Sequence, residues 1–125
     1  MASLDRARHS GRVPGVSLAP AQRAADLISA AVAAAFTVPI SELRASSRQS
    51  APVALARQSA MYLAHVTLGL SFAEVGRAFG RDRTTAAHAC RRIEDRRTEN
   101  RLDTALAELE QAVRRDLVST LGAAS

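Results

Sequence analysis

The sequence predicts an all-α fold, a compact bundle of about five to six helices, because hydrophobic residues recur at steps of three and four along most of the chain. Two further observations support this class. No segment alternates as a strand would, and no segment repeats. The 125 residues, 47% hydrophobic and 23% charged, also have the size and apolar content of one domain with its own core.

The helical pattern divides the chain into three parts. Residues 1–19 contain Gly, Pro and scattered Arg without periodicity, which predicts a flexible basic tail. Residues 20–119 carry every predicted helix and form the single domain. Residues 120–125 are expected to be a flexible C-terminus.

The first predicted helix is amphipathic and covers residues 20–36. Pro39 follows it and prevents its continuation. A short helical turn is expected over residues 41–43, and the polar residues 46–50 form an ordered loop after it.

The second long helix begins at Pro52 or Val53, since proline is tolerated in the first turn of a helix. It ends at Leu68, because Gly69 is well placed to stop it. Its predicted inner face consists of Ala56, Ala60, Leu63 and Ala64.

A strong start signal follows, because Ser71 and Glu74 have the spacing of a capping box. It predicts a helix over residues 72–79, which is short because Gly80 can take the positive φ that ends a helix. Asp82 then offers an N-cap oxygen for another helix beginning near Arg83.

The helix from Arg83 has two contrasting faces. Its inner face holds Ala86, Ala89, Cys90 and Ile93, and its outer face holds Thr84, His88, Arg91, Arg92 and Asp95. A short helix, a glycine turn and a following helix with a basic outer face are the plan of a DNA-binding helix-turn-helix. An ordinary helical pair with a solvated arginine face is the alternative.

The last predicted helix covers about residues 102–117. Its apolar stripe consists of Leu102, Ala105, Leu106, Leu109, Val113 and Leu117. We expect this stripe to pack against the first helix of the same chain, in preference to pairing with a second copy.

All 17 basic residues are arginine, and the lack of lysine excludes a P-loop ATPase and Schiff-base chemistry. The net charge of +5 and the pI of about 11.1 favour a polyanionic partner, nucleic acid ahead of an anionic membrane. Eight arginines against four acidic residues give residues 53–97 a net charge of +4, whereas residues 98–125 carry −2. The basic character therefore belongs to the middle helices.

Several function classes are excluded by composition. An aromatic content of 3% without Trp argues against binding of single strands by stacked bases. The longest nearly apolar stretch, residues 27–40, is too short to cross a bilayer. A lone Cys90 and three widely separated histidines indicate no disulfide, metal site or nucleophile. We therefore expect a cytoplasmic, nucleoid-associated protein that is not an enzyme and has no cofactor.

The segment SFAEVGRAFGRDRTTAAHACRRIE, residues 71–94, resembles the C-terminal DNA-binding domain of the bacterial replication initiator DnaA. ARQSAMYLA at residues 56–64 and VPISELR at residues 38–44 extend the resemblance, which covers roughly residues 22–118. It implies an all-helical domain of about six helices with a Trp-repressor-like helix-turn-helix, bound to double-stranded DNA.

The resemblance also implies roles for individual residues. In the family, the helix in the major groove contacts bases at the positions of Asp82, Thr84, Thr85 and His88, and Arg83 joins them through its own chemistry. The predicted contacts with the DNA backbone and minor groove are Arg48, Arg57, Gln58, Arg77, Arg81, Arg91 and Arg92. Arg57, Arg77, Arg91 and Arg92 are expected to contact phosphates because helix-turn-helix domains neutralise backbone charge around the second helix, and solvated arginines are the alternative. Among these, Arg57 and Gln58 match a backbone-contacting pair, and Arg48, with Gln49 as the alternative, matches a loop arginine that reaches the minor groove.

Three departures from the family pattern bear on specificity. The family usually has Gly-Gly-Arg-Asp-His-Thr-Thr, whereas this chain lacks one Gly and has Arg83 in place of His. Arginine pairs bidentately with guanine O6 and N7, a contact worth about 1–3 kcal/mol of base discrimination, so a different DNA site is expected. Ala73 replaces a proline that in the family touches a thymine methyl, so that contact should weaken.

The sequence therefore predicts a protein that binds specific double-stranded DNA, without an ATPase domain of its own. It would regulate transcription or replication initiation, and a protein partner would come from the machinery of one of these processes. The alternative is a protein-interaction module that keeps the fold but has lost specific DNA binding, as the missing Gly and replaced His would allow.

Overall fold

The computed structural model describes residues 18–45 and 50–119. In this part of the chain it contains six helices and no strand, which confirms the predicted all-α bundle. The helices are α2 (Leu18–Phe36), α3 (Ile40–Arg44), α4 (Ala51–Leu68), α5 (Phe72–Phe79), α6 (Arg83–Arg96) and α7 (Asn100–Leu117). The tail predicted over residues 1–19 lies outside the described residues except for its last two, with which α2 begins, and the predicted C-terminal segment 120–125 lies outside them entirely.

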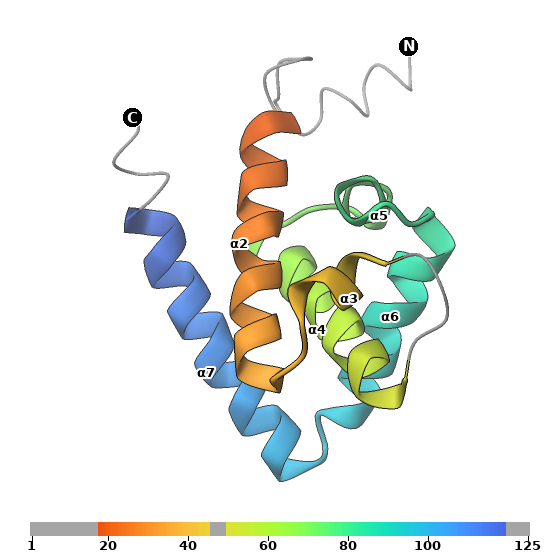
Figure 1. Cartoon of the computed structure of the whole chain (residues 1–125), viewed down its shortest axis with the longest axis vertical. Coiled ribbons are helices and arrows are strands. Elements are labelled where there is room, and N and C mark those ends of the chain that lie inside the picture. Colours follow the sequence, from red (N-terminus) through yellow and green to blue (C-terminus); the bar gives the residue numbers. More distant parts are fainter. Residues whose placement is uncertain (1–17, 46–49, 120–125) are drawn as a thin grey trace.

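The central helix is α4, which contacts each of the other described helices. In Figure 1, α2 (orange) and α7 (blue) run along one side of the bundle, and α5 and α6 (green to cyan) lie on the other. The buried residues of α4 are Val53, Ala56, Ser59, Ala60, Met61, Tyr62, Leu63 and Ala64. The predicted inner face was therefore too narrow, because helices surround α4 instead of covering one side of it.

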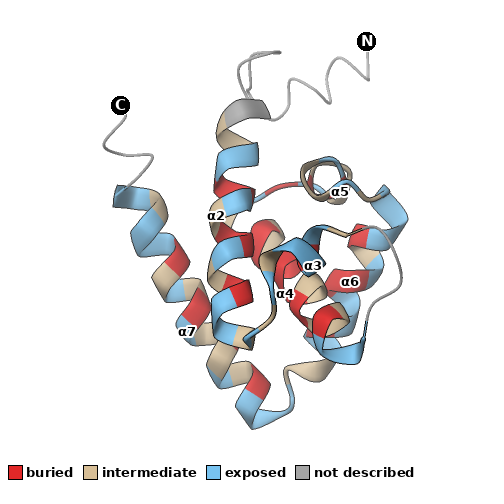
Figure 2. Ribbon diagram, viewed as in Figure 1, coloured by how far each residue is buried: buried red, intermediate tan, exposed pale blue. Residues whose placement is uncertain are grey.

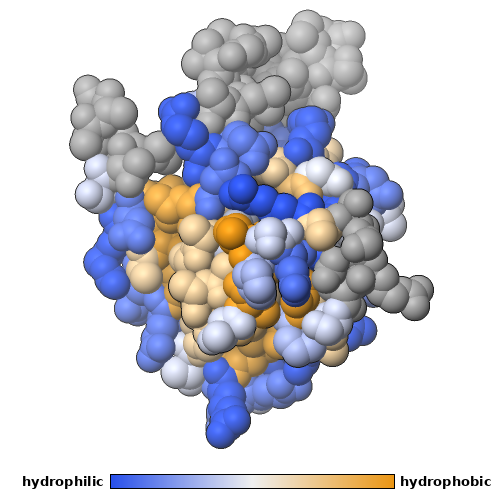
Figure 3. All heavy atoms as spheres, viewed as in Figure 1, coloured by the Kyte–Doolittle hydropathy of each residue, from blue (hydrophilic) through white to orange (hydrophobic). Residues whose placement is uncertain are grey.

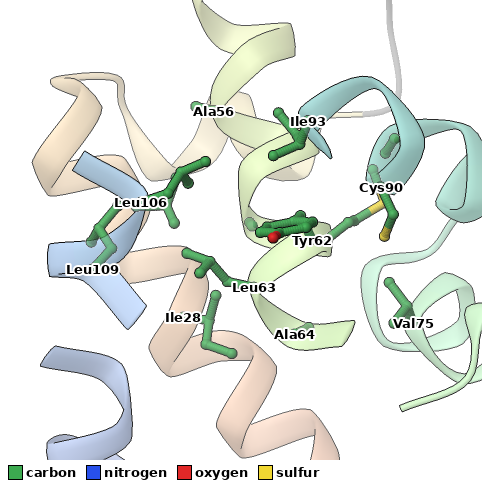
Figure 4. Packing of buried hydrophobic residues seen from close by; sticks show 14 of the residues in the cluster. Ile28, Ala56, Tyr62, Leu63, Ala64, Val75, Cys90, Ile93, Leu106 and Leu109 are labelled. Atoms are coloured by element: carbon green, nitrogen blue, oxygen red, sulfur yellow. The ribbon is translucent and has the colours of Figure 1, made fainter. Parts of the chain in front are cut away.

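The core joins the two sides of the bundle through α4. Figure 4 shows Leu63 of α4 beside Ile28 of α2, with Leu106 and Leu109 of α7 on the same side. Residues from α5 and α6 approach α4 from the other side. The leucine stripe of α7 is thus buried against α2 and α4 of its own chain, as predicted.

Local signals set the ends of α5 where the sequence predicts them. The Glu74 N–H donates to Ser71 Oγ at 3.1 Å, and the Ser71 N–H donates to Glu74 Oε1 at 2.8 Å, which completes the capping box. At the other end Gly80 has a φ of 69°, the left-handed conformation that glycine adopts without steric cost.

The end of α2 depends on a residue that the sequence does not single out. Thr37 has a φ of 56°, which is costly for a β-branched residue, and it reverses the chain two residues before Pro39. The reversal lets the Val38 N–H donate to the Ala33 carbonyl at 3.0 Å, so the last turn of α2 is closed by a backbone hydrogen bond.

The close approach of α5 to the chain entering α6 occurs at Gly76. The Arg81 N–H donates to the Gly76 carbonyl at 2.8 Å. A Cβ atom on Gly76 would lie 2.6 Å from the Arg81 carbonyl oxygen and 3.0 Å from the Asp82 carbonyl carbon and oxygen. Since all of these are backbone atoms, only glycine allows α5 and α6 to keep this spacing.

Replacing Gly76 by Ala is expected to lower the free energy of unfolding by about 1–3 kcal/mol, the usual cost of overpacking. In an unobstructed helix the same change gains about 1 kcal/mol, so the sign of the effect is informative. Urea denaturation of both proteins measures it. A urea midpoint for Gly76→Ala above that of the wild type would contradict the close approach of Gly76 to the backbone of Arg81 and Asp82.

Candidate nucleic-acid interface

The helix α6 begins at Asp82, which acts as its N-cap as the sequence predicts. Asp82 Oδ1 accepts a hydrogen bond from the Thr85 N–H at 2.7 Å. This N–H, and then the Thr85 side chain, hold the pKa of Asp82 below its ordinary value. The carboxylate is therefore charged at neutral pH, where the helix N-terminus favours negative charge.

The two faces of α6 differ as predicted. Its buried residues are Ala86, Ala89, Cys90 and Ile93. Ala86 and Ala89 have short side chains, which let α6 pack closely on α4 and α5. The exposed residues opposite them include Arg83, Thr84, His88, Arg91, Arg92 and Asp95. Figure 2 shows this division, with red and pale blue segments alternating along α6.

The five predicted base-contacting residues divide into two groups. Arg83, Thr84 and His88 are exposed, and their side chains have no hydrogen bond or ion pair within residues 18–45 and 50–119. Asp82 and Thr85 are also exposed, but they are bonded to each other in the N-cap. The side chains of Arg83, Thr84 and His88 are thus available for contacts at the start of α6. Asp82 and Thr85 fix the residue at which the helix begins.

The turn between α5 and α6 is intact although the family pattern has one more glycine. Gly80 alone takes the positive φ, and its N–H donates to the Arg77 carbonyl at 3.4 Å. Phe79, the residue before Gly80, is half-buried and packs against the core. The chain therefore keeps the helix-turn-helix geometry with one glycine in this turn.

Of the arginines predicted to contact the DNA backbone, three are exposed and unpaired in the described part of the chain. These are Arg77 on α5 and Arg91 and Arg92 on α6. By contrast, Arg97 in the chain leading into α7 is held in an ion pair with Asp103 at 2.6 Å. Arg101 and Arg115 on α7 are also exposed without a partner among the described residues, so Arg77, Arg91 and Arg92 are distinguished by their place on α5 and α6.

Arg57 and Arg81 occupy a different position, because both donate to carbonyl oxygens at the end of α3. Arg57 Nε donates to the Leu43 carbonyl at 3.1 Å, and its Nη2 donates to the Glu42 and Ala45 carbonyls at 2.9 and 3.2 Å. Arg81 Nη2 donates to the same Ala45 carbonyl at 2.7 Å. Burial, and then the charge of Arg81, lower the pKa of Arg57.

A small cavity of about 120 Å³ lies between α4 and α6 and brings predicted backbone and base contacts together. Its polar lining consists of Arg57, Gln58, Arg81, Thr85 and His88, and its apolar lining of Ala54, Met61 and Ala89. The predicted pair Arg57 and Gln58 is thus beside α6, although α4 carries it 25 or more positions earlier in the sequence.

The hydrophobic residues at the surface are grouped together. In Figure 3 they gather in the middle of the face that Figure 1 shows, and hydrophilic residues surround them. The one large hydrophobic residue that is strongly exposed in the described part is Val118, just after α7.

One predicted DNA contact, the loop arginine for the minor groove, cannot be placed. Arg48 and its alternative Gln49 lie outside the described residues, so the minor-groove contact stays a prediction.

Burial, and then the charge of Glu94, raise the pKa of Cys90 to about 11, which makes it a neutral core thiol. The described residues contain no cluster of three or more potential metal ligands and no helix that could span a membrane.

Sequence reasoning missed contacts that join distant segments. Gln22 Nε2 on α2 donates to the Ala78 carbonyl near the end of α5 at 3.0 Å. The donation of Arg81 to Ala45 spans 36 residues. Neither contact has a local sequence signal, because each depends on how the helices pack.

The family described as the bacterial dnaA protein helix-turn-helix matches residues 25–93. The chain belongs to this family. The matched residues run from α2 to the last buried residue of α6 and so include the whole helix-turn-helix. The chain thus carries a DNA-binding domain of the DnaA type, which confirms the resemblance found in the sequence.

Proteins similar to this chain agree with the assignment to the DnaA family. The chromosomal replication initiator protein DnaA 1 of Protochlamydia amoebophila is 46% identical over 63 residues, covering 50% of this chain and 14% of that protein. The DnaA of Psychromonas ingrahamii is 42% identical over 80 residues, covering 63% and 17%. The crystal structure of a DNA replication initiation factor matches with a TM-score of 0.70 and 26% identity, over 78% of this chain and 30% of that one. The chain thus spans a small part of these DnaA relatives.

The N-cap predicts a pH-dependent stability. Because the pKa of Asp82 is lowered in the folded state, its contribution is present above the unfolded pKa of about 3.9 and is lost as the pH falls through the folded pKa. Asp82→Ala should therefore be less stable than the wild type at pH 7, with the difference shrinking below about pH 4. Thermal unfolding from pH 3 to pH 7 measures this. Asp82→Asn is the matched control, because it keeps a cap oxygen without the charge. A stability difference between wild type and Asp82→Ala that stayed the same from pH 3 to pH 7 would contradict a charged N-cap at Asp82.

Proposed function

We propose that this DnaA-type domain binds a specific sequence in double-stranded DNA through the start of α6, and that its occupancy regulates transcription or replication initiation. The observation that carries the proposal is the exposed, unpaired set Arg83, Thr84 and His88 on the outward face of a helix-turn-helix. An α-helix fits the major groove, where donors and acceptors on base edges distinguish all four base pairs.

The geometry of α6 supports contacts with bases along this face. Arg83 and Thr84 are the first two residues of the helix, and in helix-turn-helix proteins the N-terminal residues of the second helix contact base edges. His88 lies four residues after Thr84, one turn further along the same face. Thr84 suits a thymine methyl or a base-edge hydrogen bond, and His88 offers a ring nitrogen.

Arginines around α6 would hold the domain on the duplex. Arg77, Arg91 and Arg92 are exposed without protein partners in the described part of the chain, and such cations fix the register of a domain by contacting phosphates. Arg91 and Arg92 follow the base-contacting turns of α6, and Arg77 comes from α5. The three would flank the bases contacted by α6.

The preferred sequence differs from that of relatives with His at the position of Arg83. A guanidinium matches guanine O6 and N7 bidentately, so Arg83 selects for guanine at the base pair it meets. Ala73 lacks the ring of the family's proline and weakens a contact with thymine at a separate position. The domain thus occupies sites of its own, where it acts as a binder without catalysis.

Binding by these residues needs no nucleotide. The chain contains no lysine and so lacks the lysine of a P-loop, and its DNA contacts come from the helical domain itself. Bound at a promoter or an origin, the domain acts by occupying the site or by bringing a protein of the transcription or replication machinery to it.

Selection of random duplexes by the protein, followed by sequencing, tests the proposal. The wild type should enrich a motif with guanine at the position met by residue 83, and Arg83→His should shift that position away from guanine. Arg115→His is the matched control, because Arg115 is an exposed arginine on α7, away from α6, and it should leave the motif unchanged. The same motif for the wild type and Arg83→His would contradict the role of Arg83. No enrichment at all, with capture of a protein partner instead, would favour the interaction module.

A further inference from the structure

The carbonyl group of Ala45 is held by two arginines from different parts of the fold. Arg57 reaches it from α4 and Arg81 from the turn before α6, at 3.2 and 2.7 Å. Figure 1 shows the end of α3 directed toward α6. Three segments of the chain therefore meet at one backbone oxygen.

The two guanidinium groups meet without a carboxylate. Neither Arg57 nor Arg81 has an ion pair with Asp or Glu in the part of the chain that the structure describes. Their charges repel, and this repulsion adds to burial in lowering the pKa of Arg57. In addition, Arg81 Nε is buried without a hydrogen-bond partner. Such an arrangement is costly, so the contacts with the end of α3 must hold it in place.

The position of Ala45 gives this contact its significance. Ala45 is the C-cap of α3, so its carbonyl lies where that helix ends. Arg81 is next in sequence to Asp82, the N-cap of α6. One side chain thus connects the start of α6 to the point where the chain leaves α3.

We propose that Arg81, together with Arg57, is a positioning residue that fixes the exit of the chain from α3 relative to the start of α6. This inference rests on the proposed function, because the start of α6 carries the proposed base contacts. With the end of α3 held by both arginines, the start of α6 keeps a constant position relative to Gln58 on α4, which is predicted to contact the DNA backbone. Arg81 then acts through Ala45 and not by touching a phosphate.

The geometry favours this role over a direct phosphate contact. Arg81 Nη2 is occupied by the Ala45 carbonyl, and Nε is buried. Arg77, by contrast, is exposed and has no partner among the residues described. The two arginines are four residues apart, on α5 and in the turn after it, and they make a matched pair for experiment.

Arg81→Ala and Arg77→Ala, in the full chain, test the inference in the free protein and on DNA. In the free protein, amide hydrogen exchange at Glu42, Leu43 and Ala45 should speed up in Arg81→Ala and not in Arg77→Ala, because the first loses the hydrogen bond that holds the end of α3. On the selected duplex, Arg81→Ala should lose about tenfold in affinity without a change in the slope of log affinity against log salt. Arg77→Ala should reduce that slope by about 0.9.

Two further variants of Arg81 separate the loss of the hydrogen bond from the loss of the aliphatic stem. Arg81→Met retains the aliphatic stem without a donor and should behave as Arg81→Ala does, whereas Arg81→Lys keeps one cationic donor and should restore protection of the amides. A salt slope reduced by about 0.9 with unchanged amide exchange in Arg81→Ala would overturn the inference and make Arg81 a phosphate contact. If the wild type selected no sequence, the proposed function would fail, yet the amide-exchange comparison would still decide whether Arg81 positions the end of α3.

Discussion

The close packing of α6 against the rest of the bundle is the constraint on which the candidate DNA interface depends. The helix is held from its inner side by Ala86 and Ala89, whose short side chains are buried, and by the backbone approach at Gly76. Because packing uses only this side, the outer side can carry polar and cationic residues without a cost in core stability. A longer side chain at any of these positions would move the start of α6 relative to α4.

The arginines of this chain serve two purposes, and their surroundings decide which. With no lysine in the sequence, arginine supplies both internal hydrogen bonds and exposed positive charge. Arg97 illustrates the first use, since it donates to the Tyr62 hydroxyl at 2.9 Å and pairs with Asp103. Arg91 and Arg92 illustrate the second. A count of basic residues therefore overstates the charge available to DNA, and only the contacts of each guanidinium separate the two groups.

Local chemistry made much of the fold predictable. The capping box at Ser71 and Glu74, the N-cap at Asp82 and the stop at Gly80 depend on neighbouring residues, and the structure has all three. Periodicity likewise gave the inner face of α6 correctly. The full burial of α4 could not be predicted, because a helix surrounded on several sides and a helix covered on one side can share the same periodic stripe.

The candidate site was predictable only in part. The exposure of Arg83, Thr84 and His88 follows from their place opposite the small residues of α6. The contacts of Arg57 and Arg81 with the end of α3 depend instead on the packing of α3, α4 and the turn before α6. Gly76 is a similar case, because its role comes from backbone atoms that lie five and six positions later in the chain.

The central claim is that the first turn of α6 contacts bases in the major groove. Its most direct test is the affinity of the double variant Arg83→Ala/Thr84→Ala for the selected duplex and for a scrambled one. Two lost base contacts should reduce specific affinity at least about tenfold, toward the value for scrambled DNA, while the Asp82 cap keeps the helix folded. Equal affinity of the wild type and the double variant for the selected duplex would contradict the claim.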